Sequence, residues 1–156
     1  MDKQISPYDA LKLESQLCFP LYACAKEVVR KYKPFLDALG ITYTQYIVMM
    51  VLWEQRQLSV KELGAYLFLD YGTLSPVLKK MEAAGLLQRL RDKQDERSVT
   101  ILLTPKGMAL REKAVEIPAK MGSCIGLDGA EAGELYRLLY KLLGKLGVGD
   151  ADNGCP

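Results

Sequence analysis

Residues 58–107 decide the fold; they read LSVKELGAYLFLDYGTLSPVLKKMEAAGLLQRLRDKQDERSVTILLTPKG. Ser59, followed by Glu62 three residues later, is a capping-box signal for the start of a helix. Leu63 and Leu67 then repeat at helical spacing, as the buried face of a short helix requires. This part of the stretch therefore predicts the first of two short helices.

A second helix follows directly. Pro76 is tolerated only in a first helical turn, which places the start of this helix between Gly72 and Ser75. Gly85 marks its end, because glycine readily adopts the left-handed conformation that closes a helix. The residues expected to face inward are Leu74, Val77, Leu78 and Met81.

Two extended runs come next, residues 86–91 and residues 98–103, and a charged tip at residues 92–97 joins them. Helix, turn, helix and charged hairpin are typical of a winged helix-turn-helix, which places one helix in the major groove of DNA. The sequence therefore predicts a mainly α fold with a small β-wing, and a DNA-binding role.

The polar side chains of this stretch suit that role. The second helix opens with groups that can bond base edges and phosphates, and lysines follow one turn later. Asp95 and Arg97 lie two residues apart at the tip, so the carboxylate can hold the guanidinium toward the minor groove. The alternative is an ordinary solvated charged face. The candidate DNA-binding residues are Tyr71, Thr73, Ser75, Lys79, Lys80, Arg89, Arg91, Asp95 and Arg97.

Composition bounds the other functions. The 156 residues suit one domain, 1–156, and the net charge of +2 means that attraction to DNA depends on where charge is placed. The absence of histidine removes histidine acid–base chemistry and most catalytic zinc sites, so we expect no enzyme activity, metal or cofactor. No apolar run is long enough to span a membrane, and the N-terminus lacks a signal-peptide core. We therefore expect a cytoplasmic protein, where thiols stay reduced.

Helices flank the winged unit, which we place at about 42–104. The first helical region, about 9–39, contains Pro20, so it should kink or restart between Gln16 and Pro20. Thr42 with Gln45 opens a buried helix over residues 43–55.

The C-terminal region, about 104–147, is also expected to be helical. Thr104 and Pro105 begin a helix that runs to about Ile117, where Pro118 bends or ends it. Residues 121–129 predict a loop or frayed turn. Asp128 and Glu131 open a last helix, which carries a leucine stripe. Residues 148–156 are expected to be a mobile tail. Because a small winged domain cannot cover so much leucine, we expect the regions at both termini to form a homodimer that binds a pseudo-palindromic operator.

Four cysteines stand at positions 18, 24, 124 and 155, and no pair has CxxC spacing. Cys18 lies on an apolar face, where a lone cysteine is ordinarily a small buried hydrophobe. Tyr22 lies one turn away on the same face. Tyr32 returns to that side after 14 residues, but lies ~21 Å along the helix, so the two meet only if two first helices cross antiparallel in a dimer. A phenol donating to sulfur would then lower the pKa of the thiol, as a peroxide sensor needs.

The chain here resembles a family. The runs LESQLCFPLYACAKEVVRKYKPFLDALGITYTQYIVMMVLWE, LDYGTLSPVLKKMEAAGL and DERSV resemble the organic-hydroperoxide-resistance regulators of the MarR family over residues 11 to about 118. The resemblance implies that Cys18 senses peroxide and that Tyr32 and Tyr43 of the other subunit are its hydrogen-bond partners. It also implies that the helix containing Thr73 reads DNA and that Arg97 is the wing arginine. Pro20 departs from the family pattern.

The family contains one-cysteine members, in which a small thiol caps the oxidised cysteine, and two-cysteine members with a resolving cysteine from the partner subunit. Cys124 is similar in placement to that resolving residue, although an incidental cysteine in a glycine-rich turn is the alternative. Cys24 is expected to be a packing residue, and Cys155 has no expected role.

The favoured function is thus a repressor released when an organic hydroperoxide oxidises Cys18 to a sulfenic acid, which condenses with a thiol. Two rivals remain open: a regulator of the same fold released by a small phenolic or aromatic ligand, and a thiol peroxidase. A partner-binding adaptor is a more remote alternative.

Overall fold

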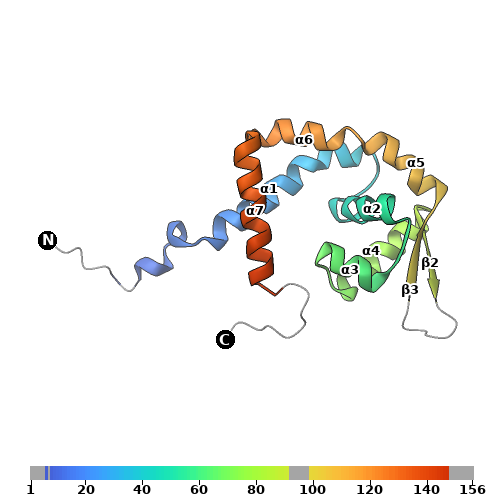
Figure 1. Ribbon diagram of the computed structural model, residues 1–156, viewed down its shortest axis with the longest axis horizontal. Helices are drawn as coiled ribbons and strands as arrows, with labels where there is room; N and C mark the ends of the chain where they lie inside the picture. Colours follow the sequence, from blue (N-terminus) through green and yellow to red (C-terminus); the bar gives the residue numbers. More distant parts are fainter. Residues whose placement is uncertain (1–5, 7, 92–98, 148–156) are drawn as a thin grey trace.

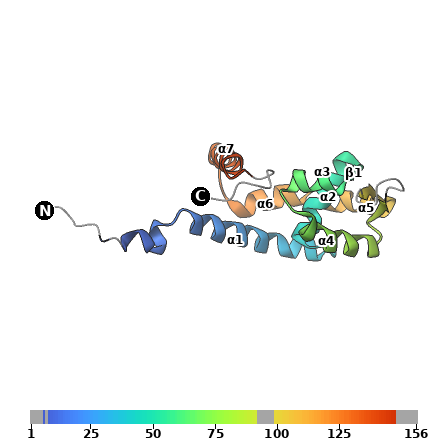
Figure 2. The same ribbon diagram turned by 90° about the horizontal axis from the view of Figure 1, so that it is seen from below.

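The computed structural model describes residue 6, residues 8–91 and residues 99–147 of the chain. Figures 1 and 2 show a group of short helices and strands, formed by residues 43–91 and 99–103 and called the head below. A long helix, α1, extends from it toward the N-terminus. The α-helices in chain order are α1 Cys18–Asp37, α2 Tyr43–Gln55, α3 Val60–Leu67, α4 Tyr71–Ala83, α5 Pro105–Ala114, α6 Ile117–Ile125 and α7 Gly129–Lys145.

Helix α2 lies at the centre of the head, as its apolar sequence predicts. The Thr42–Gln45 capping box that begins it is present, so both reciprocal hydrogen bonds form. Its buried side chains meet those of α3, α4 and the sheet in one core, which also reaches Leu36 of α1 and Met121 of α6. The buried residues of α2 are Tyr46, Val48, Met49, Leu52 and Trp53.

A three-stranded antiparallel sheet completes the head. The predicted hairpin is confirmed as β2 Leu87–Arg91 and β3 Val99–Leu103. A third strand, β1 Gln57–Ser59, was not predicted; it pairs with β3, so the strand order is β1-β3-β2. Strand β1 connects the start of α3 to the hairpin: it pairs with β3, and its last residue, Ser59, is also the N-cap of α3.

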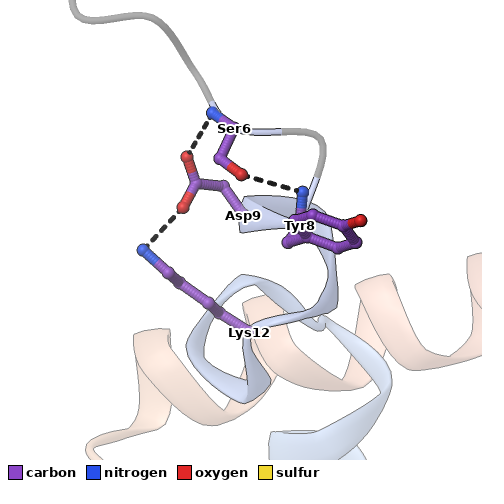
Figure 3. Close-up of polar contacts among 4 residues, drawn as sticks. All are labelled: Ser6, Tyr8, Asp9 and Lys12. Carbon is purple, nitrogen blue, oxygen red and sulfur yellow. Dashed lines mark hydrogen bonds and ion pairs between the residues drawn. The ribbon is translucent and has the colours of Figure 1, made fainter.

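The N-terminal region is not one long helix. Two 3₁₀ turns, η1 Asp9–Leu11 and η2 Leu13–Ser15, precede α1, which begins at Cys18. The expected restart near Pro20 is therefore confirmed, and Pro20 falls in the first turn, where its missing N–H costs no hydrogen bond. Asp9 holds the first turn: it accepts from the backbone N–H of Ser6 at 2.9 Å and pairs with Lys12 at 2.6 Å (Figure 3).

The C-terminal region differs from prediction. The helix that Thr104 caps ends at Ala114, and a second helix, α6, covers most of the predicted loop. Pro118 is in the first turn of α6 and begins it rather than ending its predecessor. Helix α6 exists because Ile117 and Met121 are buried beside α1, a tertiary effect that overrides the glycine and serine in its sequence.

Helix α7 begins at the Asp128–Glu131 capping box, as predicted. None of its residues is buried against the rest of the described chain. Figure 2 shows it standing clear of α1 on the far side of α6. Its leucine stripe is thus only partly covered: Leu135 and Leu138 are 46% exposed each, while Leu139, Leu142 and Leu143 are half-buried.

Gly107 joins this C-terminal region to the head. Its carbonyl accepts from Trp53 Nε1 at 3.0 Å, and a Cβ added to it would lie 2.1 Å from the Leu86 carbonyl oxygen. We predict that Gly107→Ala destabilises the protein by about 1–3 kcal/mol or more, because the backbone of α5 must move away from the hairpin. Urea unfolding measures this change.

The matched control for Gly107→Ala is Gly122→Ala in α6. No atom lies within 4 Å of a Cβ built on Gly122, so alanine there should leave stability equal or raise it by up to about 1 kcal/mol. Equal unfolding midpoints for the two variants would contradict the close approach at Gly107.

Candidate nucleic-acid interface and thiol site

Helices α3 and α4 form the predicted helix-turn-helix. The Ser59–Glu62 capping box begins α3, and Phe68 ends it in the left-handed conformation at φ 54°. The turn is tight: a Cβ on Gly64 would lie 2.6 Å from the Leu69 carbonyl oxygen, so only glycine lets the two helices approach this closely.

Helix α4 presents one face to the core and one to solvent. Leu74, Leu78 and Met81 are buried and Val77 is half-buried, as expected. The outer face carries Tyr71, Thr73, Lys79 and Lys80, all exposed, and Ser75 is half-buried. The predicted reading face therefore lies on the solvent side of the head.

The start of α4 corrects the sequence prediction. The helix begins at Tyr71 rather than between Gly72 and Ser75, and its N-cap is Asp70. Pro76 consequently lies beyond the first turn, where its missing N–H leaves the Gly72 carbonyl without a helical donor. Because Gly72 is exposed, water can satisfy that carbonyl, and the helix continues.

The basic residues of the hairpin do not all face outward. Arg89 forms an ion pair with Glu82 of α4: its Nε and Nη2 lie 2.8 Å and 2.7 Å from Glu82 Oε2. The backbone N–H of Arg89 also donates to Glu82 Oε1 at 2.9 Å. These bonds lower the pKa of Glu82, first through the Arg89 backbone N–H and then through its side chain. Arg89 thus links the hairpin to α4, the helix predicted to read DNA, instead of forming part of a free basic cluster.

Arg91 is exposed at the last described position of β2, opposite Val99 of β3. The predicted wing-tip pair, Asp95 and Arg97, lies outside the described residues.

Cys18 is the first residue of α1 and is exposed in the chain taken alone. Tyr22, one turn later, is also exposed. Because α1 is one helix from Cys18 to Asp37, the prediction that Cys18 and Tyr32 cannot touch within one chain is confirmed.

Tyr32 lies instead in an aromatic cluster between α1 and α2. Its ring centroid is 4.9 Å from that of Tyr43 and 5.7 Å from that of Tyr46. Tyr46, whose side chain is almost fully buried, was not singled out from the sequence; its place in an apolar helix was the available signal. The structure thus brings two of the three predicted tyrosines together, at the opposite end of α1 from Cys18.

Burial raises the pKa of Tyr32, Tyr43 and Tyr46 above the ordinary value of 10.0, so all three are neutral hydrogen-bond donors at physiological pH. A raised folded-state pKa stabilises the fold below the unfolded value and loses that contribution as pH rises through the folded value. We predict that the free-energy difference of unfolding between wild type and Tyr32→Phe falls as the pH rises above about 10, the ordinary pKa of tyrosine. Urea unfolding across this range tests it; a constant difference would contradict it.

The other two described cysteines are also exposed. Cys124 is in the last turn of α6, not in a loop, so that part of the prediction is wrong. Cys24 is exposed on α1 in this chain and not packed inside it as expected. Cys155 lies outside the described residues.

Within residues 8–91 and 99–147, no three His, Cys, Asp or Glu side chains gather in a way that could hold a metal ion. No helix of the described chain is long and apolar enough to cross a membrane.

The helix-turn-helix of α3 and α4 and the paired strands β2 and β3 define the chain as a winged-helix protein, a class that binds DNA. The model of the transcriptional regulator SarA/Rot family matches residues 30–114. The organic hydroperoxide resistance transcriptional regulator of Bacillus subtilis (strain 168) is 50% identical over 139 residues, covering 87% of this chain and 92% of that protein. The chain belongs to the MarR family of regulators, in its organic-hydroperoxide-resistance group.

A further relative is also a transcriptional regulator. The regulator SarZ of Staphylococcus aureus (strain COL) is 38% identical over 133 residues, 85% of this chain and 90% of that protein. Among solved structures, reduced AbfR bound to DNA, a protein of Staphylococcus epidermidis, matches with a TM-score of 0.76 and 32% identity over 89% of this chain and 95% of that one. The disulfide form of AbfR matches with a TM-score of 0.62 and 31% identity, covering 86% and 95%.

Proposed function

We propose that this chain is a homodimeric, DNA-binding transcriptional repressor that organic hydroperoxides release from its operator by oxidising Cys18. The observation that carries the proposal is the separation within one chain of an exposed thiol at one end of α1 and a cluster of neutral phenols at the other. Two α1 helices that cross antiparallel would place each thiol beside the other's phenols. A DNA-binding regulator acts in the cytoplasm, which is the compartment we propose.

The dimer in this proposal is formed by the helical regions at about 9–39 and 104–147. Leucines exposed on α7, together with Leu21 of α1 and its N-cap Leu17, supply apolar surface that the described part of the chain does not cover. Burying such surface between two copies is worth roughly 25 cal/mol per Å². A two-fold dimer would set two α4 helices ~34–36 Å apart, matching the half-sites of a pseudo-palindromic operator.

DNA contact is proposed for the exposed polar face of α4 and for the wing. Tyr71, Thr73 and Ser75 would face base edges, while Lys79 and Lys80 would contact phosphates. Arg91, Asp95 and Arg97 of the wing would reach the adjacent groove. We leave Arg89 out of this surface because Glu82 holds its guanidinium.

The chemistry at Cys18 is a two-electron oxidation. The thiolate attacks the terminal oxygen of the hydroperoxide and the O–O bond breaks, giving a sulfenic acid; the alkoxide leaves and takes a proton from water to become the alcohol. A second thiol then attacks the sulfenic sulfur and releases water, forming a disulfide. That thiol is Cys124 of the partner subunit, which is exposed in the single chain, or a small cellular thiol.

We propose that the signal reaches α4 through α5. Thr104 Oγ1 donates to the Gly85 carbonyl at 2.7 Å, and Lys106 Nζ donates to the Ala84 carbonyl at 2.7 Å. These bonds fasten the start of α5 to the end of the recognition helix, so a movement of the dimer helices would move α4. Changing a 99:1 population to 1:99 takes ~5.5 kcal/mol, which a new covalent bond and a broken set of phenol contacts can supply.

A second candidate is release by a small aromatic ligand with the cysteines uninvolved. A cavity of about 360 Å³ lies between the α1–α2 turn, the end of α4 and α5, and Lys106 and Lys113 line it beside apolar side chains. The solved structure of BpsR from Bordetella bronchiseptica, whose DNA binding is regulated by 6-hydroxynicotinic acid, matches with 26% identity and a TM-score of 0.75 over 84% of this chain and 95% of that one. Release of DNA by such a ligand in the absence of peroxide would favour this candidate.

The test of the proposed function is a gel shift on DNA from the region upstream of the gene, with and without cumene hydroperoxide, followed by mass spectrometry. We predict that peroxide releases the DNA and that the modified residue is Cys18, as a link to Cys124 or as a mixed disulfide with a small thiol. Release with Cys18 unmodified, or oxidation of Cys18 without release, would contradict the proposal. Sustained peroxide turnover with added thiol, instead of one equivalent consumed per site, would indicate a peroxidase.

A further inference from the structure

Helix α4 begins with a paired contact that involves both carboxylate oxygens of Asp70. Oδ1 accepts from the backbone N–H of Thr73 at 2.7 Å, and Oδ2 accepts from the Thr73 hydroxyl at 3.1 Å. Both side chains are exposed on the outer surface of the head. Gly72 leaves room for this arrangement, because a Cβ on it would lie 3.1 Å from Oδ1.

The contact fixes the hydrogen-bonding polarity of Thr73. A threonine hydroxyl has one proton and two acceptor lone pairs, and a free one can bond to either kind of base-edge group. The proton here is given to Asp70, so the oxygen offers only lone pairs to solvent. The bonds from Thr73, backbone first, lower the pKa of Asp70, so the carboxylate stays ionised and continues to accept.

The same contact changes what the start of α4 can bind. The N-terminus of a helix ordinarily attracts phosphate through its free N–H groups. Asp70 already takes the N–H of Thr73, and its own negative charge repels a phosphate at that point. At the opening of α4, Asp70 and the Thr73 hydroxyl therefore present acceptors, which suit groups that donate.

In the major groove the donors on base edges are the amino groups, N6 of adenine and N4 of cytosine, while guanine and thymine present acceptors. We propose that Asp70 is a specificity-determining positioning residue: by holding the Thr73 hydroxyl as an acceptor, it makes α4 select adenine or cytosine at one position of each half-site. The inference rests on the proposed function, since it requires that α4 reads an operator.

Asp70→Asn tests the inference because it preserves the cap while reversing the polarity. The asparagine oxygen can still accept from the Thr73 N–H, whereas its NH₂ group donates to the hydroxyl oxygen and frees the hydroxyl proton to donate outward. Thr73→Val keeps the shape of the side chain and removes the hydroxyl. Asp128→Asn is the matched control, because it makes the same change at the N-cap of α7.

Each full-length protein is used to select from a library of random DNA duplexes, and the base preference is read at every position of the enriched motif. We expect wild type and Asp128→Asn to prefer adenine or cytosine at one symmetric pair of positions by about tenfold. Asp70→Asn should shift that preference to guanine or thymine, and Thr73→Val should flatten it, with other positions unchanged.

If Asp70→Asn and Thr73→Val enrich the wild-type motif and bind it only more weakly, Asp70 is a helix cap alone and the inference is wrong. If wild type itself enriches no motif, the DNA reading of the proposed function fails first. The two failures are thus distinguishable in one experiment.

Discussion

Cys18→Ser is expected to bind operator DNA as wild type does and to remain bound when an organic hydroperoxide is added. Serine has nearly the same size, and residue 18 is exposed at the start of α1, far from the core of the head, so the fold and the reading helices should be unchanged. The hydroxyl cannot be oxidised along the sulfenic-acid route, so the peroxide cannot modify residue 18 and should not release the DNA. Wild type should lose operator affinity by up to roughly 10⁴-fold, the ratio that separates a 99:1 from a 1:99 population.

Cys24→Ser is the matched control for this prediction. Cys24 is exposed on the same helix as Cys18, so a general effect of removing a surface thiol from α1 would appear in both variants. We expect Cys24→Ser to respond to peroxide as wild type does. A fluorescence-anisotropy titration of labelled operator, before and after one equivalent of cumene hydroperoxide, compares the three proteins.

A peroxide response in Cys18→Ser equal to that of wild type would remove Cys18 from the mechanism and favour the aromatic-ligand candidate. Cys124→Ser then separates the two routes within the thiol mechanism. It should still respond when a small thiol is present, but should form no link between subunits.

The helix boundaries that the sequence predicted correctly are those set by local chemistry. The capping boxes Thr42–Gln45, Ser59–Glu62 and Asp128–Glu131 each involve residues three positions apart, so the signal and the structure it specifies lie in the same short segment. The same is true of Gly85, whose φ of 73° ends α4. Such features need no knowledge of the rest of the chain.

The errors arose where distant contacts decide the outcome. Residues 121–125 resemble a loop by composition, yet burial of Met121 beside α1 keeps them helical. Strand β1 has only three residues and is specified by its pairing with β3. Helix α4 begins earlier than Pro76 alone predicts, because the exposed Gly72 carbonyl tolerates the loss of its helical hydrogen bond.

The same distinction between local sequence and distant contacts applies to the residues of the candidate site. The spacing of Cys18 and Tyr32 on one helix was sufficient to predict that they are apart in a single chain, because helical rise is fixed. The cluster of Tyr32 with Tyr43 and Tyr46 depends on how α1 packs on α2, so no local pattern specifies it. The Glu82–Arg89 pair likewise joins two elements of the fold. The sequence shows only the charge of Arg89, which is why it predicts this residue to be on the DNA-binding surface.

The second large effect is expected at α7. We predict that Leu138→Glu abolishes dimerisation while leaving the head folded, because Leu138 contacts no core of its own chain and is 46% exposed there. In a two-fold dimer the substitution occurs twice. Because Leu138 is already half covered in the single chain, each copy loses about half of the 1.5–3 kcal/mol that full burial of a leucine gives, besides the cost of desolvating a carboxylate. The dimer dissociation constant should therefore rise by at least ~10²-fold. Sedimentation measures the change, and operator affinity should fall with it, because a monomer presents one reading helix instead of two.

Gly133→Glu separates loss of the interface from a general effect of a new charge on α7. Gly133 is on the opposite side of the helix, ~160° around it from Leu135, and no atom lies within 4 Å of a Cβ built there. This variant should remain dimeric, and it should bind operator as wild type does. If Leu138→Glu also sediments as a dimer at the wild-type concentration, the leucine stripe of α7 is not what joins two copies. The antiparallel crossing of α1 would then have to be held together without it, and the contact proposed between Cys18 and the partner's phenols would lose its main structural support.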